Sequence, residues 1–247
     1  MSSAIYDEIG TLYAKYRRPD PRIRAQIEAA LGDAKSVLNV GAGTGSYEPS
    51  DRYVVAVEPS EVMLAQRRSG SAQAVRSVGE SLPFASGSFD AALAVLTLHH
   101  WKSQRVGLRE MARVARRVVI LHFDQTVHGR FWVFTDYLPE CNDLSTARTL
   151  APEEVAAEIT ATRTEIVPVP SDCIDGFNWA YWKRPDRYLE SDVRACISTF
   201  ALLSDDLVET RMEMLRRDLD DGTWRRRHGH LLALDTVDAG LRLVIRE

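Results

Sequence analysis

Short apolar runs alternate with helical patterns along the first half of the chain. Residues 60–68 and 104–115 repeat apolar side chains at helical spacing. The apolar runs are too short for helices and are typical of buried strands; they occupy residues 36–40, 53–57, 74–78, 89–96 and 117–123. Because strands that alternate with helices form βαβ units, the pattern predicts a parallel sheet with helices on both faces.

The pattern changes beyond residue 124. Residues 125–150 are irregular and rich in aromatic side chains, and residues 171–235 have mostly helical spacing. The later elements that we expect are helices at 152–161, 193–203 and 207–219 and strands at 165–169 and 240–246. We expect one α/β domain over residues 1–247. Its parts are a helical N-terminal cap at 1–35, a ligand-binding core at 36–124, and insertions at 125–150 and 171–235 that form a substrate lid.

Composition and charge exclude several classes of protein. With 45% hydrophobic and 27% charged residues the chain is typical of a globular protein, and a net charge of −4 argues against a nucleic acid partner. No apolar stretch approaches the ~20 residues that span a bilayer, and no signal peptide is recognisable, so we expect a cytoplasmic protein without a membrane partner. Cys141, Cys173 and Cys196 form no CxxC, which favours free thiols, and no metal site is expected.

Three of the 14 glycines lie within five residues, directly after the first apolar run. Gly41, Gly43 and Gly45 fit a sharp turn where a ligand approaches the backbone closely. In the dinucleotide fingerprint GxGxxG the third glycine would fall at position 46, which is Ser46. Glu58 follows the second apolar run, where a carboxylate can accept hydrogen bonds from a ribose diol. The alternatives are a turn required by packing and a solvated acid at a strand end.

Four segments together resemble the motif series of class I S-adenosylmethionine (SAM)-dependent methyltransferases. They are VLNVGAGTG, VEPSEVML, ESLPFASGSFDAAL and LTLHHW, between residues 37 and 101. The chain is similar in particular to the small-molecule branch (type 11) related to ubiquinone and menaquinone C-methyltransferases. The resemblance implies a Rossmann-like, doubly wound sheet of seven strands with strand 7 antiparallel. It also implies SAM as the cofactor, which makes residues 36–124 a SAM-binding core, and S-adenosylhomocysteine as the product.

The resemblance implies in addition which residues contact the cofactor. The glycine loop would pack under the methionine portion and the ribose, the acid after the second strand would bind the ribose hydroxyls, and the following loops would border the adenine. The end of the fourth strand would contact the methionine amine, and an aromatic-then-arginine pattern near the N-terminus would close over the cofactor. The residues at these positions are Gly41, Ala42, Gly43, Glu58, Pro59, Met63, Gly79, Glu80, Leu96, Tyr13, Tyr16 and Arg17.

Three departures distinguish the chain from this family pattern. Asn39 stands where the family usually has an acid, and Val78 where many relatives have an aspartate that reaches the adenine amino group. Only residues 46–52, including Pro49, separate the glycine loop from the next strand, which is too few for the usual first helix. Because SAM carries no phosphate, the anion-binding helix N-terminus of nucleotide sites is dispensable here.

The candidate catalytic residues are histidines. Methyl transfer requires alignment of the acceptor, and a base when the acceptor is a hydroxyl or a carbon acid. His99 and His100 follow the fourth strand at the edge where doubly wound folds bind ligands, and His122 ends the fifth. His100 is the first candidate, and a structural role is the alternative for all three. Two aromatic clusters suit either the walls of a lid or plain packing: Phe131, Trp132, Phe134, Tyr137, and Phe177, Trp179, Tyr181, Trp182.

The sequence thus predicts a SAM-dependent methyltransferase that acts on an oxygen, nitrogen or carbon atom of a small organic molecule. One alternative is a SAM-binding protein without transferase activity, which Asn39 and Val78 leave open. Another is an NAD(P)-dependent oxidoreductase, which Ser46 disfavours. Neither the acceptor nor the oligomeric state follows from the sequence.

Overall fold

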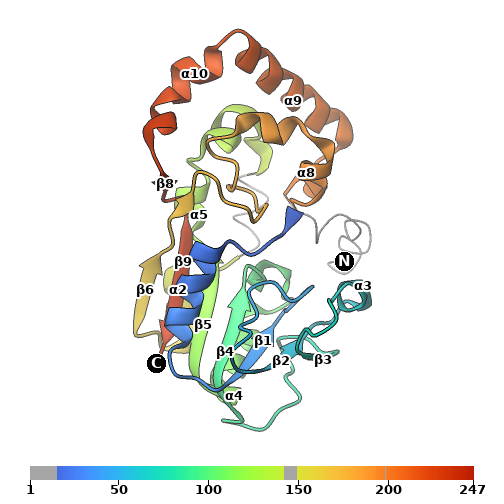
Figure 1. Cartoon of the computed structure of the whole chain (residues 1–247), viewed down its shortest axis with the longest axis vertical. Coiled ribbons are helices and arrows are strands. Elements are labelled where there is room, and N and C mark those ends of the chain that lie inside the picture. The colour runs from blue at the N-terminus through green and yellow to red at the C-terminus, as the bar shows by residue number, and fades with distance from the viewer. Residues whose placement is uncertain (1–15, 142–148, 198) are drawn as a thin grey trace.

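Seven strands form one sheet in the computed structural model, which describes residues 16–141, 149–197 and 199–247 (Figure 1). Their order is β3-β2-β1-β4-β5-β9-β6. Their bounds are Ser36–Val40 (β1), Tyr53–Val57 (β2), Gln73–Val75 (β3), Phe89–Val95 (β4), Ala115–Phe123 (β5), Arg163–Ile166 (β6) and Leu241–Arg246 (β9). Neighbours pair parallel except β9, which runs antiparallel to both β5 and β6. The predicted seven-stranded sheet with an antiparallel last strand is therefore confirmed.

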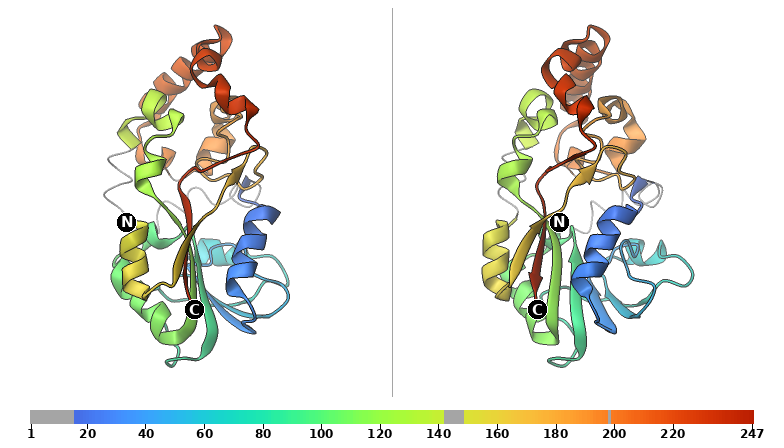
Figure 2. Two further views of the ribbon diagram at one scale, coloured as in Figure 1. Left: turned by 90° about the vertical axis from the view of Figure 1, so that its left-hand side faces the viewer. Right: turned by 60° about the vertical axis from the view of Figure 1, so that its left-hand side comes forward.

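Both faces of the sheet are apolar because helices cover both (Figure 2). α2 (Pro21–Leu31) packs on one face, and α4 (Gln104–Val114) and α7 (Pro152–Ile159) pack on the other. α2 begins at a proline after the N-cap Asp20, whose carboxylate accepts the backbone N–H of Arg22 at 3.0 Å. These signals fix where the helix starts and therefore where the chain reaches the sheet.

Some elements differ from their predicted bounds. The helix expected at 60–68 is the single turn α3 (Glu61–Ala65), capped by Ser60. The strand expected at 165–169 begins and ends earlier as β6, and Val169–Pro170 forms the separate strand β7. The helix expected at 193–203 is wrong: α8 (Ser191–Ala195) ends early and a 3-10 turn, η4 (Phe200–Leu202), follows.

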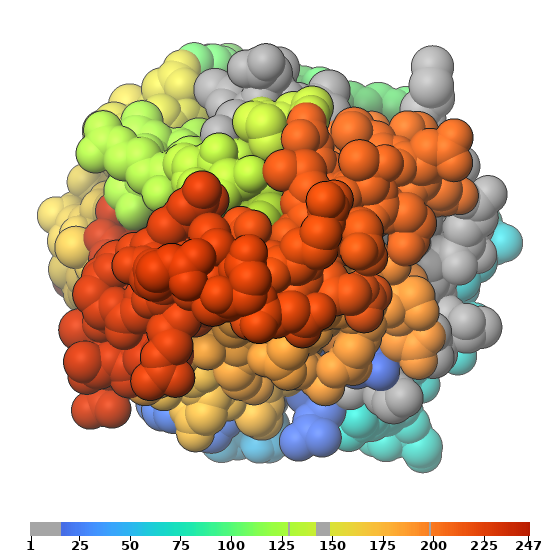
Figure 3. Space-filling view, turned by 90° about the horizontal axis from the view of Figure 1, so that it is seen from above, coloured from blue at the N-terminus to red at the C-terminus, as the bar shows by residue number. Residues whose placement is uncertain are grey.

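A second layer lies above the carboxyl ends of the parallel strands (Figures 1 and 3). We call residues 125–141, 169–197 and 199–239 the upper layer. Besides β7, α8 and η4 it contains α5 (Gln125–His128), η2 (Val133–Tyr137), η3 (Pro185–Leu189), α9 (Asp205–Asp220), α10 (Thr223–His228), η5 (Gly229–Ala233) and β8 (Thr236–Val237). Seen from above, the long α9 and α10 cover this face of the molecule beside residues 125–141.

Aromatic side chains join the two inserted segments of the upper layer. Trp132 meets Trp224 edge-on, with ring centroids 5.4 Å apart, and its indole N–H donates to the Trp182 carbonyl at 3.0 Å. The Tyr137 hydroxyl donates to Asp218 at 2.8 Å. The predicted aromatic clusters thus pack in a core: Trp132, Phe134, Tyr137, Phe177, Trp179, Tyr181 and Trp182 are buried, and Phe131 is partly buried.

No helix within the described ranges is both long and apolar enough to cross a bilayer. Within the same ranges, no group of three or more histidine, cysteine, aspartate or glutamate side chains could hold a metal ion. Cys141, Cys173 and Cys196 are buried free thiols.

Candidate cofactor site

The glycine loop follows β1 and turns sharply at the centre of the sheet. The N–H groups of Gly41 and Ala42 both donate to the Val57 carbonyl of β2, at 2.8 and 3.0 Å. Gly41 has a φ of +70°, and a Cβ atom there would lie 2.1 Å from the Thr97 hydroxyl. Only glycine fits this position, because the backbone is left-handed and the end of β4 lies against it. Gly43 is also left-handed, with a φ of +52°.

Glu58, directly after the end of β2, lies against this loop. Its carboxylate accepts the N–H of Gly43 at 2.8 Å and that of Ser60 at 2.9 Å, one on each oxygen. Glu58 is only 7% exposed, and burial raises the pKa of its carboxyl against the lowering effect of these two hydrogen bonds. Since each carboxylate oxygen can accept two hydrogen bonds, one acceptor position on each remains for a diol.

A buried ion pair beneath the loop was not foreseen from the sequence. Glu48 and Arg67 pair at 2.8 Å, with their side chains 9% and 7% exposed. The Asn39 amide donates to the same carboxylate at 3.2 Å, and Arg67 donates to the Gly43 carbonyl at 3.3 Å. Glu48 therefore brings a carboxylate to Asn39, the position where the family acid is missing. The acid in the short return 46–52 was the available signal.

Strain marks the end of β4. Leu96 has a φ of +52°, a conformation that costs a residue with a Cβ about 1–3 kcal/mol. Its N–H donates to the Leu121 carbonyl at 2.9 Å, and the next residue, Thr97, packs on Gly41. Strained backbone that is held by its surroundings is typical of binding sites. The turn at Leu96 and Thr97 thus meets Gly41, which was predicted on a separate motif, at the carboxyl edge of the sheet.

The residues predicted around the adenine lie in two segments: Pro59 and Met63 before and within α3, and Gly79 and Glu80 in the loop that follows β3. Met63 is buried, and its methyl group lies 3.4 Å from where a Cβ on Gly43 would be, whereas Pro59 is exposed. Gly79 packs on the ring of Trp101, and Glu80 accepts the Ser103 N–H at 2.9 Å, which ties this loop to the start of α4.

The N-terminal residues of the predicted site reach the upper layer. Arg17 pairs with Asp175 through its Nε at 2.7 Å, and the backbones of these two residues form an antiparallel bridge. The Tyr16 carbonyl accepts the Gly176 N–H at 2.8 Å. Tyr13 lies outside the described residues.

His99 and His100 lie in a 3-10 turn, η1 (Leu98–His100), directly after β4. Both are partly exposed, and their ring centroids are 3.8 Å apart. The series of rings continues from His99 to Phe123 at 5.9 Å and from Phe123 to Trp179 of the upper layer at 4.6 Å. The imidazole pair thus adjoins the partly exposed ring of Phe123, which packs on the buried Trp179 of the upper layer.

The structure does not bring His122 to this surface. Alternate residues of β5 face opposite sides of the sheet, so His122 points away from the side that Phe123 faces. It is 1% exposed, its Nε2 lies 2.7 Å from the Leu150 carbonyl, and burial lowers its pKa. Since Nε2 must carry a proton to bond a carbonyl, His122 acts here as a neutral donor that holds residue 150.

Comparison with known proteins agrees with this geometry. The methyltransferase-domain family matches residues 38–123. A demethylmenaquinone methyltransferase of Corynebacterium urealyticum is 37% identical over 128 residues, which cover 47% of this chain and 54% of that protein. The chain thus aligns with about half the length of this curated relative.

Solved structures extend the likeness to the upper layer. A crystal structure described as a methyltransferase from an antibiotic biosynthesis pathway of Anabaena variabilis superposes with a TM-score of 0.87 at 32% identity. That match covers 95% of this chain and all of the other. A (4+2)-cyclase, SpnF, at 15% identity and a TM-score of 0.55, covers all of this chain and 97% of the other and shares the fold alone.

The chain belongs to the class I SAM-dependent methyltransferases. SAM is the cofactor of this family, which decides between the SAM and dinucleotide interpretations of the GxGxG loop.

Proposed function

We propose that this chain transfers the methyl group of SAM to a small organic acceptor. The observation that carries the proposal is the buried Glu58 carboxylate, held against Gly43 at the carboxyl edge of the sheet with acceptor capacity to spare. When bound, SAM supplies a methyl group that its sulfonium already activates.

The chain's own residues bind and orient this cofactor in the proposal. The ligand approaches the backbone of Gly41–Gly43 closely, and Glu58 accepts hydrogen bonds from its ribose hydroxyls. The remaining assignments keep the family positions. Pro59, Met63, Gly79 and Glu80 border the adenine; Leu96, Tyr13, Tyr16 and Arg17 surround the methionine portion.

The acceptor in this proposal is a flat, largely apolar molecule with an acidic hydroxyl or carbon atom. Support comes from the partly exposed ring of Phe123, which lies beside His99, and from His100, whose ring lies next to that of His99. One imidazole of the pair, His100 first, accepts the acceptor's proton as the new bond forms. The upper layer excludes water from this surface. The names of the relatives, a demethylmenaquinone methyltransferase and a methyltransferase of antibiotic biosynthesis, agree with a small organic acceptor.

Calorimetric titration tests the cofactor assignment. Wild type binds SAM and S-adenosylhomocysteine, and Glu58→Ala weakens SAM binding by at least ~1 kcal/mol, about fivefold, the scale of one hydrogen bond. The matched control is Glu61→Ala, because Glu61 is exposed and pairs with Arg76 at the surface. Tight binding of NADH without a response to either adenosyl ligand would overturn the proposal. Unchanged affinity in Glu58→Ala would show that the ribose lies elsewhere.

A transfer assay tests the acceptor. The protein, SAM with a radiolabelled methyl group and a panel of phenols and hydroquinones should give labelled product, and His100→Asn should slow its formation while SAM binding stays intact. SAM binding without transfer to any member of the panel would favour the alternative of a SAM-binding protein without transferase activity.

A further inference from the structure

Side chains, rather than a helix, hold the return from the glycine loop to β2. Tyr47 lies in this return with a left-handed φ of +62°. Its ring is buried. A strained conformation of this kind persists only where the surrounding contacts fix it. Whatever holds the Tyr47 side chain therefore also holds the backbone that follows the glycine loop.

The contact that holds Tyr47 comes from the upper layer. Its hydroxyl donates to Asp175 at 2.9 Å and accepts the Asp20 N–H at 3.2 Å. Asp175 is 1% exposed, and its other carboxylate oxygen accepts from Arg17 at 2.7 Å. One buried carboxylate of the upper layer thus joins the N-terminal segment to the return of the glycine loop.

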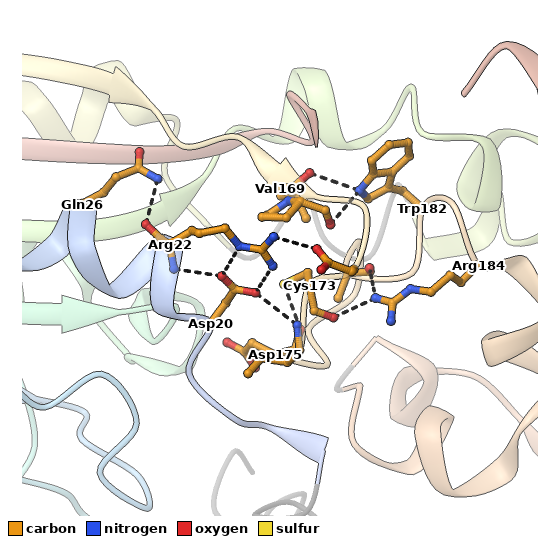
Figure 4. Close-up of polar contacts among 12 residues, drawn as sticks. Asp20, Arg22, Gln26, Val169, Cys173, Asp175, Trp182 and Arg184 are labelled. Atoms are coloured by element: carbon orange, nitrogen blue, oxygen red, sulfur yellow. Dashed lines mark hydrogen bonds and ion pairs between the residues drawn. The ribbon is translucent and has the colours of Figure 1, made fainter. Parts of the chain in front are cut away.

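Asp20 fixes the backbone beside Asp175 (Figure 4). Its buried carboxylate accepts the Ile174 N–H at 3.2 Å and is gripped by the guanidinium of Arg22 at 2.8 and 2.9 Å. Burial acts to raise the pKa of Asp20, but the hydrogen bonds from Arg22 and Ile174 hold it below its usual value. Asp20 therefore stays ionised at neutral pH and anchors Ile174, the residue before Asp175, to the start of α2.

Glu48, the residue after Tyr47, extends these contacts to the glycine loop. Its carboxylate receives hydrogen bonds from Asn39 and Arg67, and Arg67 also donates to the Gly43 carbonyl. Contacts therefore run without a break from Asp175 through Tyr47 and Glu48 to Gly43.

We infer that Asp175 is a positioning residue for the cofactor: through Tyr47, the upper layer holds the glycine loop in the conformation that binds SAM. The inference rests on the proposed function. It makes the upper layer part of the cofactor site, because its contact with Tyr47 holds the return to β2 that has no first helix. SAM affinity then depends on a residue more than 120 positions beyond the loop.

Calorimetric titration of purified full-length variants with SAM tests this role. Asp175→Asn should raise the Kd for SAM about tenfold and Tyr47→Phe about fivefold, on the scale of losing a charged and a neutral hydrogen bond. The double variant should bind no more weakly than the weaker single variant, because both changes break the same series of contacts. The control is Asp172→Asn, since Asp172 is a carboxylate of the same segment that is 77% exposed and pairs with Arg22 at the surface. Its Kd should equal that of wild type.

Measuring the unfolding midpoint of each variant together with its Kd for SAM distinguishes a positioning role of Asp175 from a purely structural one. A purely structural role lowers the unfolding midpoint of both variants but leaves the Kd unchanged while they are folded, and that result would overturn the inference. If Asp175→Asn does not fold, Tyr47→Phe decides alone, because it removes one oxygen and keeps the buried ring. A wild-type protein that binds no SAM would overturn the proposed function instead.

Discussion

Replacing Gly41 by alanine should destabilise the protein far more than the same change at Gly43. Both residues have a positive φ, which costs alanine about 1–2 kcal/mol. At Gly41 the new Cβ would also lie 2.1 Å from the hydroxyl and 2.9 Å from the Cβ of Thr97, an overpacking that costs a further ~1–3 kcal/mol. At Gly43 the nearest atom is the Met63 methyl group at 3.4 Å, an ordinary contact. We therefore expect losses of ~2–5 kcal/mol for Gly41→Ala and ~1–2 kcal/mol for Gly43→Ala.

Urea unfolding followed by tryptophan fluorescence measures the two losses, with an unchanged slope showing that the unfolded states are comparable. Thr97→Ala removes the hydroxyl and the methyl group but leaves the Cβ contact, so it should recover part of the loss in the Gly41→Ala background and none in Gly43→Ala. Equal losses for the two alanine variants, or no recovery with Thr97→Ala, would refute the argument that the end of β4 sets the shape of the loop.

Three further predictions concern neighbouring groups. Burial raises the pKa of Glu58, so SAM affinity should be full above that pKa and fall as the pH drops through it. The fall should begin at a higher pH than it would for an ordinary glutamate. Titrations with SAM across the acidic range should show this fall in wild type and not in Glu58→Gln. Glu48→Gln leaves Arg67 buried without its counter-ion and should cost ~3 kcal/mol in urea unfolding, whereas the added change Arg67→Met should restore most of it. Gly107→Ala puts a Cβ 2.3 Å from the Trp101 ring, so it should destabilise by ~1–3 kcal/mol in thermal unfolding, although alanine normally stabilises a helix; a gain in stability would contradict this packing.

The parts of the molecule that follow from local sequence are the sheet, the glycine loop and Glu58. Each depends on residues close together in the chain: apolar runs of strand length, a GxGxG turn, and an acid one residue after a strand. The contact between Gly43 and Glu58 could be predicted because parallel neighbouring strands end at the same edge.

The contacts that hold the loop could not be predicted, because they join distant segments without periodic pattern. Tyr47 and Asp175 are 128 positions apart, and nothing near either residue indicates the other. His122 shows a different limit. The alternation of β5 places His122 and Phe123 on different faces of the sheet. The sequence does not say which of these faces meets the upper layer. The aromatic clusters were ambiguous because the same side chains suit a core and a pocket wall.

The position of β9 in the sheet sets the order in which the protein can assemble. β9 pairs Val244 with Ile120 of β5, and among the described residues β6 pairs in this sheet only with β9. Contacts between distant residues form late, because closing long loops costs more entropy than closing short ones. During synthesis β1 to β5 can pair at once, while β5 keeps an open edge and β6 stays unpaired until the whole upper layer has been made. We therefore expect premature association between chains to begin at these two strands.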